Sequence, residues 1–77
     1  MAVRKKHMLF YTLNKMVEAE GRIESNGRKV YIDKDDILRV EKGGTTGLAC
    51  DMTEREMESV IDKWREKNPE RFSEITG

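Results

Sequence analysis

Cys50 is the residue whose type and position first suggest covalent chemistry, because it stands just before a predicted helix start. The positive end of a helix dipole lowers the pKa of a thiol and favours the nucleophilic thiolate. Nucleophilic catalysis also needs a base, and the only histidine, His7, lies in a distant basic stretch, while the neighbouring Asp51 opposes ionisation of the thiol. We therefore expect Cys50 to be a small buried residue, and we expect no enzyme activity.

Two polar segments resemble phosphate-binding and calcium-binding loops, but neither has the full sequence pattern of such a loop. The run 42–47 is rich in glycine, but a phosphate-binding loop needs a Lys-Ser/Thr pair directly before a helix, and here short-strand residues intervene. Asp33, Asp35 and Asp36 could attract a hard cation. A calcium loop counted from Asp33 would, however, place Ile37 at the fifth position, where an oxygen ligand is required. We interpret both segments as turns, and we expect no cofactor and no metal site.

Four carboxylates follow one line along a predicted C-terminal helix. They recur every four residues: Glu54, Glu58, Asp62 and Glu66. Such a row, with a spacing of about 6 Å along the helix, could complement a basic groove on a protein partner or occupy a site meant for nucleic acid. Three basic residues flank the row and dilute its field, which leaves a solvated helix face as the alternative: Arg55, Lys63 and Lys67.

Basic side chains form a second candidate surface, which would bind nucleic acid. Its members come from the N-terminus and from a predicted hairpin: Arg4, Lys5, Lys6, Arg22, Lys29 and Tyr31. The basic groups could meet phosphates, and the tyrosine could stack on a base. Glu24 lies within this patch, however, and no helix-turn-helix, zinc-finger or aromatic RNA-binding signature occurs. Nucleic acid is therefore the second hypothesis, and a protein partner is the first.

Two amphipathic helices must position these surfaces. The acidic row belongs to a helix predicted for residues 52–67, whose apolar side chains share one face: Met57, Val60, Ile61 and Trp64. Two overlapping capping signals precede it, and either could start the helix: Asp51 with Glu54, or Thr53 with Glu56. A first helix is predicted for residues 8–20, after a flexible basic arm of residues 1–7, and a short helical turn is predicted for residues 69–75.

The strands lie between the two main helices. A hairpin over residues 22–32 folds about Asn26-Gly27, the pair that accepts the two positive φ values of a type I′ turn. Its register places Ile23 opposite Val30. Further strands are predicted for residues 37–41 and 48–50. The sequence thus predicts an α+β fold, with helices against one face of a small antiparallel sheet of about four strands.

Size and composition bound the function. The 77 residues predict a single domain, and 36% apolar against 39% charged residues is lean for a monomer, so we expect a homodimer. One cysteine and no long apolar run predict a cytoplasmic protein that does not enter a membrane. The leading hypothesis is a small regulatory protein that acts by protein–protein contact, such as a phage or mobile-element inhibitor of a larger host complex.

Overall fold

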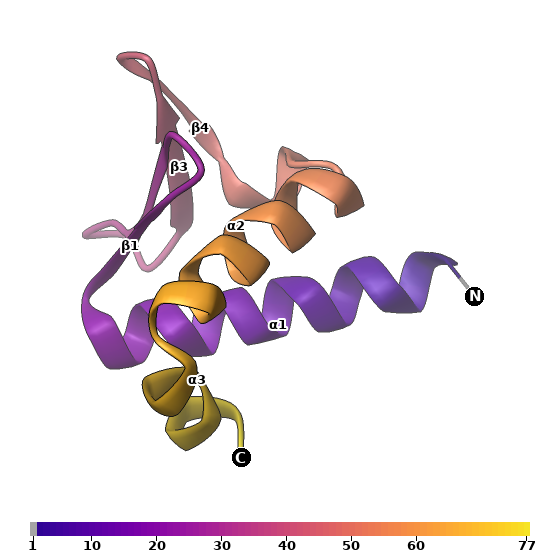
Figure 1. Ribbon diagram of the computed structural model, residues 1–77. Coiled ribbons are helices and arrows are strands. Elements are labelled where there is room, and N and C mark those ends of the chain that lie inside the picture. Colours follow the sequence, from indigo (N-terminus) through magenta and orange to yellow (C-terminus); the bar gives the residue numbers. More distant parts are fainter. Residues whose placement is uncertain (1) are drawn as a thin grey trace.

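The computed structural model describes residues 2–77, with side chains from Lys5 onward. It is a mixed α+β fold in which a long helix, four antiparallel strands and two further helices follow one another along the chain (Figure 1). The elements are α1 (Ala2–Glu20), β1 (Arg22–Ser25), β2 (Arg28–Ile32), β3 (Leu38–Lys42), β4 (Thr45–Leu48), the 3-10 turn η1 (Ala49–Asp51), α2 (Glu54–Lys67) and α3 (Pro69–Thr76). No helix within the described residues is long and apolar enough to cross a membrane.

The first hairpin has the predicted turn and register. Asn26 and Gly27 have φ values of 53° and 74°, as a type I′ turn requires. Ile23 then pairs with Val30 across β1 and β2. Opposite residues share a face of the sheet, so these two apolar side chains point together toward the helices, where both are fully buried.

The second hairpin differs from the prediction, because β4 begins and ends earlier than residues 48–50. Gly43 and Gly44 both have positive φ and form a tight turn, which pairs Lys42 directly with Thr45. The strand therefore ends at Leu48, and the chain enters η1. The prediction of a buried Cys50 is wrong for the same reason: in η1 its side chain is exposed, and Ala49 is the residue that turns into the core.

Helix α1 begins at Ala2, six residues before the predicted start at Met8. Residues 2–7 are thus the first turns of this helix and not a separate arm. The apolar repeat that marks the buried face begins only at Leu9, which is why the sequence pattern places the start too late. Good helix formers precede it, and neither Gly nor Pro interrupts residues 2–20.

The helices lie together on one side of the sheet, and the β3–β4 turn extends away from them (Figure 1). Between helices and sheet is one apolar core that contains the predicted stripe of α2. Its buried members are Leu13, Met16, Val17, Ile23, Val30, Leu38, Ala49, Met52, Met57, Val60, Ile61 and Trp64. An ion pair between Arg71 and Glu20 joins α3 to the end of α1. The opposite face of the sheet carries no helix within residues 2–77.

Candidate protein-binding surface on the helical layer

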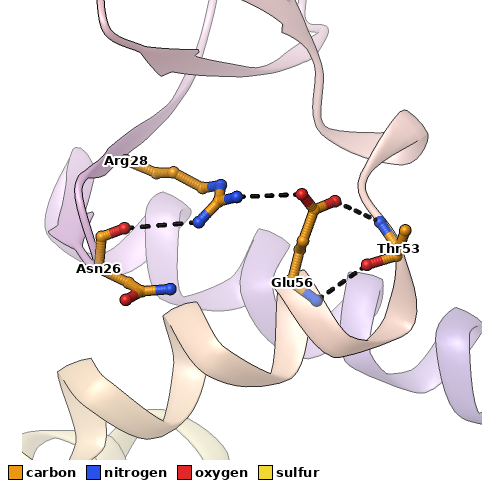
Figure 2. A network of polar contacts seen from close by, with 4 residues as sticks. All are labelled: Asn26, Arg28, Thr53 and Glu56. Carbon is orange, nitrogen blue, oxygen red and sulfur yellow. Dashed lines mark hydrogen bonds and ion pairs between the residues drawn. The ribbon is translucent and has the colours of Figure 1, made fainter.

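A polar network at the start of α2 holds the acidic helix in place (Figure 2). Of the two capping signals, the structure uses Thr53 with Glu56. The Glu56 backbone N–H donates to Thr53 Oγ1 at 3.1 Å, and the Thr53 backbone N–H donates to Glu56 Oε1 at 2.8 Å. These reciprocal bonds satisfy two amides that a helix start would otherwise leave unpaired. The start of α2 is therefore defined by its own sequence.

The same glutamate also ties α2 to the sheet. Arg28 begins β2 on the side facing the helices, and its Nη2 donates to Glu56 Oε2 at 3.0 Å (Figure 2). Only 11% of the Arg28 side chain is exposed. The pKa of Glu56 lies below its usual range, chiefly because the Thr53 N–H donates to the carboxylate, and the Arg28 charge adds to this effect while burial opposes it. Both oxygens of Glu56 thus have partners within the fold, which gives this carboxylate a structural role.

The predicted acidic row lies along α2 on a flank that reaches α1. Glu54, Glu58 and Asp62 are half-buried, and Glu66 is exposed. Glu58 Oε2 lies 3.2 Å from Lys5 Nζ on α1, and Asp62 Oδ1 accepts from Arg65 at 3.0 Å. Cations of the same chain therefore border the row.

The predicted basic surface is divided between two faces of the molecule. Lys5 belongs to the helical layer, where it pairs with α2. Arg22, Lys29 and Tyr31 alternate with the buried hairpin residues and lie on the open face of the sheet. Arg22 Nε is 3.0 Å from Glu24. Lys6 is half-buried, and the Arg4 side chain lies outside the described residues. The structure therefore does not place the basic N-terminus and the hairpin in one patch.

Two exposed apolar side chains on α1 were missed by sequence reasoning. Met8 and Tyr11 are 67% and 60% exposed, the highest values among the large apolar residues with described side chains. Lys15 lies one turn further along, with its Nζ 5.4 Å from the centre of the Tyr11 ring. Their spacing of three and four residues places them on one side of the helix. This spacing is offset from the buried stripe that includes Leu13. It could therefore have indicated from the sequence that Met8 and Tyr11 are exposed.

His7 lies at a surface hollow that Cys50 does not line. This hollow has a volume of about 380 Å³ and is bordered by His7, Met8, Tyr11 and Thr76. No group of three His, Cys, Asp or Glu side chains that could hold a metal ion occurs in the described part of the chain.

Asp33 instead organises the turn between β2 and β3. Its Oδ1 accepts from the backbone N–H groups of Asp35 and Ile37 at 2.8 and 3.0 Å. Its Oδ2 pairs with Arg39 Nε at 2.8 Å. The hydrogen bond from Arg39 is the main reason that the pKa of Asp33 lies below its usual range. As predicted, this acidic segment is a turn.

No family model, no curated protein and no solved structure matches this chain.

Proposed function

We propose that this protein is a small non-enzymatic binding protein that acts through protein–protein contacts on its helical face. The helical face consists of the acidic row of α2 and three neighbouring residues of α1: Glu54, Glu58, Asp62, Glu66, Lys5, Met8 and Tyr11. The observation that carries the proposal is the exposure of Met8 and Tyr11 on α1, the helix whose Lys5 pairs with Glu58 of this charged row. Met8 follows Lys5 by three residues, and Tyr11 follows Met8 by three, so the three side chains are neighbours along α1.

The composition of this face suits protein recognition. Met and Tyr are enriched in interfaces, and a few such apolar or aromatic anchors supply most of the binding energy. The charges around them supply orientation and encounter rate more than affinity. A partner that matches this face has an apolar pocket for Tyr11 and a basic groove for the carboxylates.

The ion pairs on the helical face favour exchange with a partner. The Lys5 and Glu58 side chains are 56% and 44% exposed, and exposed ion pairs are worth at most about 1 kcal/mol. A basic group of a partner can therefore replace Lys5 at Glu58 at little cost. A small domain of this kind would suit a phage or mobile-element inhibitor that blocks a larger complex in a reducing cytoplasm.

The test is affinity capture from a lysate followed by mass spectrometry, and then measurement of the Kd with each captured protein. Tyr11→Ser and the triple change Glu54→Lys, Glu58→Lys, Asp62→Lys should each weaken binding at least tenfold. Glu70→Lys on α3 is the matched control, since Glu70 is exposed and lies outside the helical face. Binding that survives both changes to the helical face would contradict the proposal.

Nucleic-acid binding is the second candidate, and one feature of the sheet supports it. Tyr31 lies between Arg22 and Arg39 in a row across three strands on the open face. A base could stack on this tyrosine while the arginines meet phosphates. Glu24 and Asp33 already pair with these arginines and weaken the field. Binding of a single-stranded oligonucleotide that falls steeply with salt and is lost in Tyr31→Ala would favour this function over the first.

A further inference from the structure

The outer edge of β4 differs from the other edge of the sheet because the strand itself carries no charged side chain. The strand order is β1-β2-β3-β4, so β1 and β4 are the two edges. Edge strands expose backbone N–H and C=O groups, and charged side chains, proline or a covering element normally block further pairing. β1 carries Arg22 and Glu24, and Ser25 Oγ donates to the Val60 carbonyl of α2 at 2.9 Å.

β4, by contrast, contains no charged residue and no proline. Its sequence is Thr45-Thr46-Gly47-Leu48, and both threonines are exposed. In an antiparallel ladder alternate residues direct their backbone groups away from the partner strand. Within residues 2–77 no strand lies on that outer side. β4 is therefore a short, uncharged edge that can accept one more antiparallel strand.

Charges near the two ends of β4 indicate that the added strand comes from a second copy of this chain. Lys42 precedes the turn into β4, and Asp51 follows its end; both are exposed, and neither has an ion-pair partner among the described side chains. A two-fold axis beside β4 would align the β4 strands of two copies antiparallel. The start of β4 in one copy would then lie next to the end of β4 in the other. Lys42 of each copy then approaches Asp51 of its partner copy, twice per dimer.

We propose that β4 is the self-association edge of this protein, where a second copy of the chain adds its own β4 to form a continuous eight-stranded sheet. Four residues a side make a small interface, so the dimer is weak and forms in the micromolar range or above. The helical face lies on other elements and remains free in this dimer. The inference is independent of the proposed function, and either can fail without the other.

Sedimentation equilibrium over a concentration series tests this inference. The wild-type protein should change from the mass of one chain to the mass of two as the concentration rises. Thr46→Lys should weaken association at least tenfold, because it places like charges near the two-fold axis. The change should not disturb the monomer, since Thr46 pairs with Glu41 on β3 and a lysine there faces a carboxylate. Thr76→Lys, the same change at the end of α3, should leave association unaltered.

A charge exchange tests the geometry more sharply. Lys42→Glu and Asp51→Lys should each weaken self-association, because each creates two like-charge contacts. An equimolar mixture of the two variants should form a heterodimer in which both contacts are again attractive. Single chains at every concentration, a dimer that Thr46→Lys leaves intact, or a mixture no more associated than its components would each overturn the inference. Pairing of β4 with an extended segment of another protein, in a chain that stays monomeric, would overturn it as well.

Discussion

Lys5 on α1 and Glu58 on α2 form an ion pair with 3.2 Å between Nζ and Oε2. The sequence pattern assigns Lys5 to a basic candidate surface and Glu58 to an acidic one. Their contact brings one basic side chain of α1 beside the acidic row of α2. Net charge alone therefore does not describe this surface.

The Lys5–Glu58 pair should contribute little to folding. We expect a double-mutant cycle of Lys5→Met and Glu58→Gln to give a coupling energy below about 1 kcal/mol, decreasing further with added salt, because both side chains are half exposed. Urea unfolding of the wild type, the two single variants and the double variant measures this coupling energy. A coupling of several kcal/mol would mean that the pair is structural, and the case for its exchange with a partner would be lost.

Removal of the capping box of α2 should lower the free energy of unfolding more than removal of the alternative capping residue. Thr53→Ala should lower the free energy of unfolding by about 1 kcal/mol, because its hydroxyl accepts from the Glu56 amide. Asp51→Ala removes the other predicted cap and should change it by less than about 0.5 kcal/mol. Both values come from chemical denaturation at low protein concentration, where the chain is monomeric. Equal losses in the two variants would contradict the observed start of α2.

Two methionines should respond oppositely to truncation. Met57 is fully buried in the core, so Met57→Ala should cost about 2–5 kcal/mol of stability. Met8 is 67% exposed, and Met8→Ala should change stability by less than about 0.5 kcal/mol. Thermal and urea unfolding give the two values. A large loss for Met8→Ala would show that this residue packs within the fold, and it would then not serve as an interface anchor.

Stability should decrease in acid, partly through Asp33. The pKa of this carboxyl is lowered in the folded protein, first by the hydrogen bond from Arg39. Its contribution is therefore complete above the unfolded value of about 3.9 and is lost as the pH falls through the folded value. Unfolding followed between neutral pH and about pH 2 should show this decrease. Asp33→Asn should make the profile flatter, whereas Asp35→Asn, which leaves the ion pair intact, should not.

The elements themselves were largely determined by the sequence. Asn26-Gly27 specifies a two-residue turn, and a turn of known length determines which residues of its two strands are paired. The apolar repeat that contains Met57 and Trp64 likewise determines both the helical state of α2 and its buried face. These features depend on residues close together in the chain, so a local pattern is enough to predict them.

Contacts between distant segments were decided by the tertiary structure. The exposure of Cys50 depends on where β4 ends, which follows from its pairing with β3. The meeting of Lys5 with Glu58 joins residues more than fifty positions apart, and it requires α1 to begin before the predicted start at Met8 and to pack beside α2. Periodicity indicates which side of each element is buried, but it does not specify which exposed side chains of two elements will be neighbours. That choice depends on how the helices pack on the sheet, and here it brings Lys5 of α1 to Glu58 of α2.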